Sequence, residues 1–267
     1  MFCLNSANLV NGLATTKFPS VVALLRPEGN FYTICTGTFV SHNTLVTAAH
    51  CIDESESGGM FYVPGHYIKD IDKSWGEKVT PIKAFHATQA KTYTNGSQSI
   101  LLSDSIYDLA ILLFPENTAP STSPLLNRTV VEDETVTVVG FGKSSTTNPS
   151  ISSPLVRRYG QNKAVQNPED IFPDYVLPDG LVGTIGRSET DLSAVNSCQL
   201  STDSQAATGD SGGPLFFEDR IAATTSVGQT NAAQRKDLAV YVDLNSAASK
   251  ALMEKATAEG ATFEAAE

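Results

Sequence analysis

The sequence predicts an all-β protein closed by one C-terminal helix. Short apolar runs rich in β-branched residues alternate with clusters of Gly, Pro, Asn and Ser, a spacing typical of a β-barrel or β-sandwich. Only the last segment departs from this pattern, because its apolar residues recur at helical spacing. With 267 residues, 41% of them hydrophobic, the chain can form one large β domain or two small ones around a sizeable core.

Six segments are predicted to be strands, because each is short, apolar and bounded by turn residues. They are residues 21–25, 38–46, 110–114, 136–142, 214–217 and 239–244. Two segments of mostly small and polar residues, 53–59 and 144–153, are predicted to be exposed loops.

The C-terminal helix is predicted over residues 244–257. Leu244, Ala248 and Leu252 are among the apolar residues that recur at roughly helical intervals. Either Asn245 or Ser246 can serve as the N-cap, since both side chains can accept a hydrogen bond from the first turn. The Ala- and Glu-rich residues beyond the helix are expected to fray.

The net charge is −11, from 18 basic and 29 acidic residues. Such a balance disfavours nucleic acid and anionic membranes as partners, and no apolar run approaches the length of a membrane span. The first residues lack the basic start and apolar stretch of a signal peptide. Either an export signal is absent from this chain or the protein stays inside the cell.

Four cysteines (Cys3, Cys35, Cys51 and Cys198) suggest an oxidising compartment, and a secreted or periplasmic location is the expectation. No two of them have the close spacing of zinc ligands. The acidic residues between positions 70 and 77 are interpreted as solvated charges rather than calcium ligands, because their spacing defines no ligand set. We expect neither a metal nor a cofactor.

Three short motifs carry the chemistry. Residues 209–214 (GDSGGP) present the Ser211 hydroxyl among small residues, but a neutral hydroxyl needs a base to become an effective nucleophile. His50, in residues 47–51 (TAAHC), can act as this base because imidazole titrates near neutrality. Asp108, which begins the run DLAIL, can orient the imidazole and stabilise its protonated form. The backbone N–H groups of Gly209 and Ser211 can bind an oxyanion.

The three motifs, in the order His, Asp, Ser, resemble those of the chymotrypsin/trypsin family of serine endopeptidases. The resemblance extends from about Leu9 to the C-terminal helix. It implies two six-stranded antiparallel β-barrels, about residues 9–120 and 121–243, followed by the helix at 244–257. The active site would lie between the barrels, with His50 and Asp108 from the first and Ser211 from the second.

The same resemblance implies peptide-bond hydrolysis through an acyl-enzyme. Protein or peptide substrates and protein inhibitors would be the partners, and the chain would be a monomer. A disulfide between Cys35 and Cys51 would hold the His50 loop in place. A bridge between Cys3 and Cys198, or two unpaired cysteines, are both left open.

Residues 9–12 (LVNG) resemble the family's Ile-Val-Gly-Gly, the N-terminus that is released when the precursor is cut. This resemblance implies that residues 1–8 are a propeptide remnant and that the intact chain is a zymogen. After cleavage, the ammonium group of Leu9 would pair with Asp210 and order both the oxyanion hole and the specificity pocket.

The specificity pocket is expected to be uncharged. Trypsin-like relatives carry an Asp six residues before the nucleophile, where this chain has Gln205. The local alignment lacks the family's usual Cys at Ala207, so a slip that brings in Asp203 is an alternative.

The pocket walls would be Gly228 and Ala239, and the segment Ser226–Val227–Gly228 would pair with the substrate backbone by β-strand addition. Ser226 would also hydrogen-bond Asp108. A pocket of this composition favours medium-sized uncharged side chains before the scissile bond, such as Leu, Met, Gln or an aromatic residue.

Two other function classes compete with the peptidase. A catalytically silent scaffold or binding protein of the same family usually loses a triad residue, whereas this chain has all three. An esterase of the α/β-hydrolase type carries Gly-x-Ser-x-Gly with the triad in the order Ser, Asp, His. Here the serine comes last, which favours the peptidase.

Overall fold

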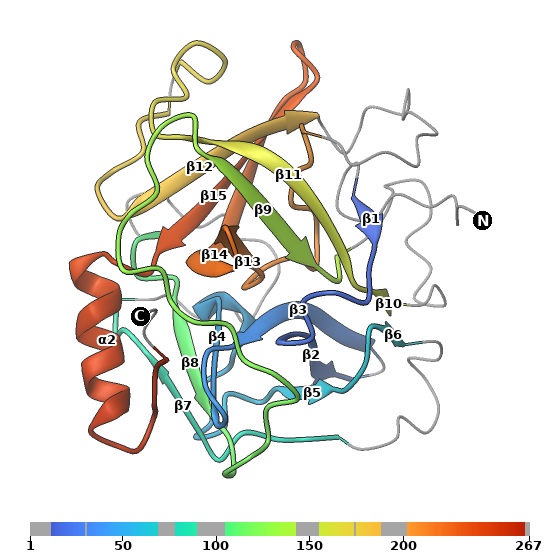
Figure 1. Cartoon of the computed structure of the whole chain (residues 1–267), viewed down its shortest axis with the longest axis vertical. Coiled ribbons are helices and arrows are strands. Elements are labelled where there is room, and N and C mark those ends of the chain that lie inside the picture. The colour runs from blue at the N-terminus through green and yellow to red at the C-terminus, as the bar shows by residue number, and fades with distance from the viewer. Residues whose placement is uncertain are drawn as a thin grey trace.

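A computed structural model describes residues 12–29, 31–68, 78–89, 105–142, 155–173, 175–187 and 202–264. Two antiparallel sheets form two halves of the molecule, one below the other in Figure 1. The sheets come from successive parts of the chain, as the colour change from blue and green to yellow and orange shows. The all-β prediction with a C-terminal helix is therefore confirmed.

The N-terminal half is a six-stranded sheet in the order β5-β2-β3-β4-β8-β7. Its strands are β2 (Val21–Glu28), β3 (Phe31–Phe39), β4 (Thr44–Thr47), β5 (Phe61–Val63), β7 (Lys83–His86) and β8 (Ala110–Leu113). Within the described residues β5 and β7 are not paired with each other, and Tyr62 instead bridges Val79. Among those residues this half is thus a six-stranded half-barrel, which is consistent with the fold that the sequence predicted.

The C-terminal half is a closed barrel. Its strands are β9 (Thr135–Gly140), β11 (Arg158–Val165), β12 (Leu181–Arg187), β13 (Pro214–Phe217), β14 (Arg220–Asn231) and β15 (Lys236–Asp243). They follow the order β11-β12-β15-β14-β13-β9, and the pairing of β9 with β11 closes the ring. Val138, Val182, Leu215 and Tyr241 are among the buried residues of one core cluster of this half.

Each half receives a segment from the far end of the chain. The short strand β1 (Leu13–Ala14) pairs with β11 of the C-terminal barrel. In the other direction, the Thr262 N–H donates to Thr44 Oγ1 at 3.0 Å, and the Glu264 N–H donates to the Val40 carbonyl at 3.2 Å. A small sheet of β6 (Tyr67–Ile68) and β10 (Leu155–Val156) adds a further link between the halves.

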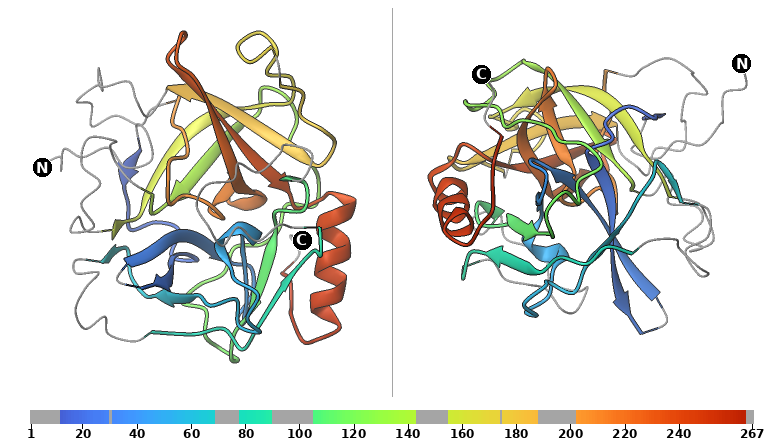
Figure 2. Two further views of the ribbon diagram at one scale, coloured as in Figure 1. Left: turned by 180° about the vertical axis from the view of Figure 1, so that it is seen from behind. Right: turned by 60° about the horizontal axis from the view of Figure 1, so that its bottom comes forward.

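Helix α2 (Ala247–Thr257) follows β15 but packs against β7 and β8 of the N-terminal half, as two views show in Figures 1 and 2. Its N-cap is Ser246, whose hydroxyl accepts a hydrogen bond from the Ser249 N–H at 3.1 Å. The predicted helix and one of its two predicted caps are confirmed.

The predicted strand 38–46 is wrong as a single element. It is split between β3 and β4, because residues 40–43 form the turn of a hairpin. The Val40 N–H donates to the Thr44 carbonyl at 2.9 Å, and the Thr44 hydroxyl donates to Asn43 Oδ1 at 2.9 Å. The other five predicted strands overlap β2, β8, β9, β13 and β15. Among the strands of the two large sheets, β5, β7, β11, β12 and most of β14 were not predicted.

Candidate active site

His50 lies in a short 3-10 turn, η1 (Ala49–Cys51), directly after β4. Asp108 stands just before β8, and β4 pairs with β8 in a register that places Thr47 opposite Ala110. The pairing of these two strands therefore brings the motifs together. The His50 backbone N–H donates to Asp108 Oδ1 at 2.9 Å, and the His50 ring Nδ1 lies 2.8 Å from Asp108 Oδ2.

The Asp108 carboxylate is almost fully buried, at 4% exposure, and also accepts a hydrogen bond from the Ser226 hydroxyl. Because a carboxylate can only accept, Nδ1 of His50 carries the proton and Nε2 is left as the basic nitrogen. Burial lowers the pKa of His50, but the charge of Asp108 and its hydrogen bond outweigh that effect, so the pKa is raised above 6.5. The Ser226–Asp108 contact expected from the sequence is present.

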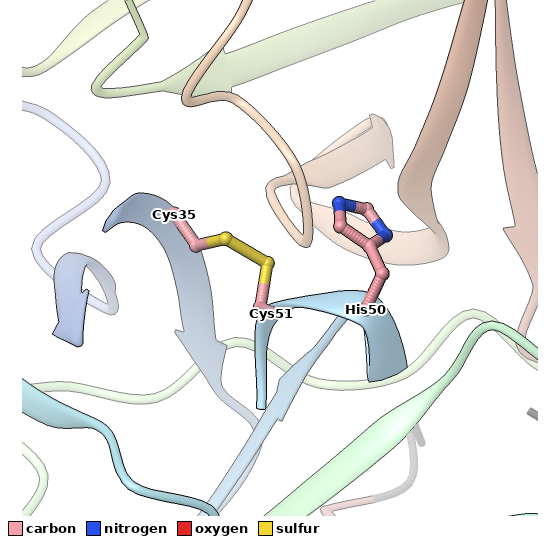
Figure 3. A group of neighbouring side chains, drawn as sticks. All are labelled: Cys35, His50 and Cys51. Atoms are coloured by element: carbon pink, nitrogen blue, oxygen red, sulfur yellow. A yellow bond between two sulfur atoms is a disulfide. The ribbon is translucent and has the colours of Figure 1, made fainter. Parts of the chain in front are cut away.

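A disulfide joins Cys35 of β3 to Cys51, the residue after His50, as the sequence predicted. Figure 3 shows this bridge beside the His50 ring. The three side chains also form a group of metal-ligand type, with their ligand atoms within 4.8 Å of one another. The two sulfur atoms are bonded to each other and offer no thiolate, so the group serves to anchor the His50 turn.

The loop of residues 207–213, called the nucleophile loop below, is held by its own backbone. The Asp210 N–H donates to the Ala207 carbonyl, the Gly212 N–H to the Thr225 carbonyl and the Gly213 N–H to the Asp210 carbonyl. No hydrogen-bond acceptor within the described part of the chain takes the N–H groups of Gly209 and Ser211. These are the two groups that the sequence assigned to an oxyanion hole.

The nucleophile loop sits directly against the His50 side of the molecule. The Thr36 N–H of β3 donates to the Ser211 carbonyl at 2.8 Å, and the Cys51 sulfur lies 3.8 Å from the same oxygen. The Thr36 hydroxyl donates to the Gly209 carbonyl at 3.0 Å. No hydrogen bond joins the side chains of His50 and Ser211 in this structure. Such bonds are often long before substrate arrives.

A pocket of about 290 Å³ opens beside Ser211. Four predicted substrate-binding residues line it, namely Ser226, Val227, Gly228 and Ala239. The remaining lining residues are Ala206, Ala207, Thr208, Thr225, Gln229, Thr230, Asp237 and Leu238. The sequence reasoning missed Asp237, although residues two apart on a strand share a face, so the expected wall at Ala239 also pointed to position 237.

Gln205 does not line the pocket, which corrects its expected position at the base. Its side chain is fully buried, and both of its polar atoms are occupied. The amide nitrogen donates to the Thr184 carbonyl at 2.8 Å and to the Asp237 carbonyl at 2.7 Å, while the Thr184 hydroxyl donates to its oxygen at 2.6 Å. Gln205 therefore joins β12 to β15 and has no group left for a substrate.

Of the predicted activation pair, only Asp210 belongs to the described residues. Its carboxylate is fully buried and accepts hydrogen bonds from the Gly142 N–H at 2.7 Å and the Ala207 N–H at 2.8 Å. Leu9, residues 1–8 (the predicted propeptide remnant), Cys3, Cys198 and the acidic segment 70–77 all lie outside the described residues.

A histidine paired with a buried aspartate in one β half, close to a serine in a Gly-rich loop of the other half, is the arrangement of a serine hydrolase. The trypsin family model matches residues 11–251, so the chain belongs to the trypsin family. Two snake venom serine proteases, from Naja atra and Bungarus multicinctus, are each 26% identical over 230 residues, 85% of this chain and 71% of theirs. A venom serine protease of Polistes dominula is 25% identical over 225 residues, 80% of this chain and 71% of its own.

The family match and these relatives indicate a serine endopeptidase, which is a hydrolase. In the part of the chain that the structure describes, no helix is long and apolar enough to cross a membrane.

Proposed function

We propose that this chain hydrolyses peptide bonds through an acyl-enzyme, with Ser211 as nucleophile, His50 as base and Asp108 as orienting acid. One observation carries the proposal. The His50–Asp108 pair, with Nε2 left basic, stands against a serine loop whose two N–H groups at Gly209 and Ser211 have no acceptor among the described residues.

The proposed steps follow from these positions. Ser211 Oγ attacks the substrate carbonyl carbon while its proton passes to His50 Nε2, and Asp108 stabilises the imidazolium that forms. The N–H groups of Gly209 and Ser211 bind the resulting oxyanion. His50 then protonates the departing amine as the C–N bond breaks. A water molecule, deprotonated by His50, attacks the acyl-enzyme and releases the acid.

A fluorophosphonate probe tests the catalytic assignment. Covalent labelling of the parent chain should be lost in Ser211→Ala and kept in Ser123→Ala, a buried serine in another part of the chain. A folded chain that neither labels nor cleaves peptides would be the silent scaffold. Hydrolysis of esters without any peptide cleavage would favour an esterase instead.

We further propose that the pocket accepts medium-sized uncharged side chains before the scissile bond. The support is that every lining residue except Asp237 is uncharged and that Ala239 adds a methyl group to one wall. The lining carboxylate of Asp237 is the feature that challenges this proposal. A peptide library decides: cleavage after Arg or Lys that disappears in Asp237→Asn would overturn the uncharged assignment and give the specificity to Asp237.

Activation by cleavage before Leu9 is also proposed. It is supported by the buried carboxylate of Asp210, the group with which the released ammonium would pair. N-terminal sequencing of fully active material should begin at Leu9. Full activity with Met1 still attached would contradict it.

The relatives named as venom proteases support secretion of this chain, and a periplasmic location is the bacterial equivalent. We propose that the protein is a monomer and that its partners are protein substrates and protein inhibitors. Its first half would span residues 9–120, and its second half would begin at about residue 121.

A further inference from the structure

The carboxylate of Asp210 is completely buried in the C-terminal barrel. It lies against the backbone of β9 and its extension, since a Cβ built on Gly140 would come within 2.0 Å of Asp210 Oδ1. Two backbone N–H groups, from Gly142 and Ala207, satisfy part of its hydrogen bonding. A buried carboxylate nevertheless needs a positive charge nearby, because removing it from water is costly.

Arg158 is placed to supply this charge. It is the first residue of β11 and stands directly opposite Gly140 in the pairing of β9 with β11. Directly opposed residues point to the same face, with Cβ atoms about 5 Å apart. Because Gly140 has no side chain, the space above it holds the Asp210 carboxylate, and the Arg158 side chain starts one strand away on that same face. Arg158 is itself only 3% exposed.

The electrostatics agree with this placement. Burial lowers the pKa of Arg158 to about 10, and the charge of Asp210 acts in the opposite direction. The guanidinium thus stays protonated at neutral pH. The charge of Asp210 also helps to raise the pKa of Tyr241, after the larger effect of burial. The charge of Asp210 therefore influences the pKa of two side chains on different strands.

We infer that Arg158 is a positioning residue, an internal countercharge that holds Asp210 and through it the nucleophile loop. This inference rests on the proposed function, in which Gly209 and Ser211 of that loop bind the oxyanion. Arg158 acts through Asp210 and touches no substrate. It should therefore stabilise the loop in the uncut chain, which then reacts slowly instead of being inert. A released N-terminus would add to this stabilisation.

Arg157 provides a matched control. It is the neighbouring residue, has the same side chain and is also buried, at 4% exposure. Its guanidinium donates to the Lys17 carbonyl at 2.8 Å and to the Gly65 carbonyl at 3.2 Å, and lies 5.7 Å from the centre of the Phe141 ring. None of these three contacts involves the nucleophile loop, so Arg157 serves as the control for packing.

The experiment compares the uncut chain with Arg158→Met, Arg158→Lys and Arg157→Met, using the rate of fluorophosphonate labelling and the affinity for a peptide boronate. Arg158→Met should slow labelling and weaken boronate binding by about 10²-fold, the effect of losing one oxyanion donor. Arg158→Lys should restore most of both. Arg157→Met should lower the unfolding temperature while leaving the labelling rate unchanged.

Each remaining outcome is decisive. Equal labelling of the parent chain and Arg158→Met would overturn the inference while leaving the triad intact. A Lys variant that folds yet reacts as slowly as the Met variant would also overturn it, because charge would then not be the cause. If Arg158→Met does not fold, the labelling rate of the Lys variant and its hydrogen exchange across residues 207–213 decide the matter. If the parent chain labels neither uncut nor after cleavage before Leu9, the proposed function itself fails.

Discussion

The two halves of the molecule hold their share of the site by different means. In the N-terminal half a disulfide ties the His50 turn to β3, and one carboxylate binds both the backbone and the ring of His50. In the C-terminal half the nucleophile loop has no disulfide within the described residues; backbone hydrogen bonds, close glycine contacts and one buried carboxylate hold it. The histidine is thus fixed in advance, whereas the proposed oxyanion hole would depend on the buried charge of Asp210.

The largest expected effect comes from Asp108→Asn, which breaks the N-terminal pair. In trypsin-type enzymes, the source of the template, this change lowers kcat by about 10⁴. In the parent chain the pKa of His50 is raised above 6.5. Because His50 can accept a proton only when its ring is neutral, activity should rise with pH through that raised pKa. Without the Asp108 charge, burial dominates and the acid limb should move below 6.5.

The check is a profile of kcat/KM against pH for both forms. An unchanged acid limb would contradict the role of Asp108.

The same pKa shift gives a stability prediction. The interaction between protonated His50 and Asp108 stabilises the fold fully below pH 6.5, and this contribution is lost as pH rises through the raised pKa.

Removing the Cys35–Cys51 bridge should destabilise the protein by about 3 kcal/mol, the value expected for a closed loop of this length. The two cysteines are 16 residues apart. In the double alanine variant, hydrogen exchange should rise in β3 and η1 before β13 and β15. Equal loss of protection in both halves would show that the disulfide stabilises the whole molecule and not the His50 side alone.

Gly212 lies at the seam between the halves. Its φ is +76°, and a Cβ there would lie 2.0 Å from Thr47 Oγ1 and 2.6 Å from the Ala48 nitrogen. Gly212→Ala should therefore cost about 1–3 kcal/mol through overpacking and displace Ser211 enough to lower kcat. The control is Gly29→Ala, where φ is +61° but no atom lies within 4 Å. Chemical denaturation of both variants measures the free energy of unfolding and separates the steric clash at Gly212 from backbone strain. Equal losses of free energy in the two variants would contradict close packing of the two halves at Gly212.

The smallest expected effect is at the helix that joins the halves. Ser246→Ala removes the N-cap of α2 and should cost about 1 kcal/mol. Ser246→Asp should keep the cap and lose little. Thermal unfolding of the pair measures the difference, and equal unfolding temperatures for the two variants would show that the cap contributes nothing.

The parts of the site that could be predicted from the sequence are those that consist of short runs of consecutive residues. The segments around His50, Asp108 and Ser211 are of this kind, and each lies beside a strand or turn of distinctive composition. The α2 cap was found for the same reason. By contrast, β11 was not predicted, because its buried positions include Arg158, Gly160 and Asn162, so its sequence pattern lacks the apolar alternation of a half-buried strand.

Gln205 and Asp237 show a second limit. Spacing from Ser211 placed Gln205 at the pocket, but it could not show which way a loop side chain turns. In the structure, hydrogen bonds to β12 and β15 turn Gln205 inward. Asp237 could have been found from the alternation of β15, since it shares a face with Ala239. The turn within 38–46 was missed because Val40 is apolar and hides the Asn43 turn signal.

The exchange of chain ends between the halves has a consequence for synthesis. The first half is made early, yet hydrogen bonds to Val40 and Thr44 come from residues 262–264, and β1 leaves that half to join β11. When residues 1–120 have emerged from the ribosome, the residues 262–264 that hydrogen-bond to their sheet have therefore not yet been made. Neither half, cut out at that boundary, carries its complete set of neighbours, so the pair should fold as one cooperative unit late in translation.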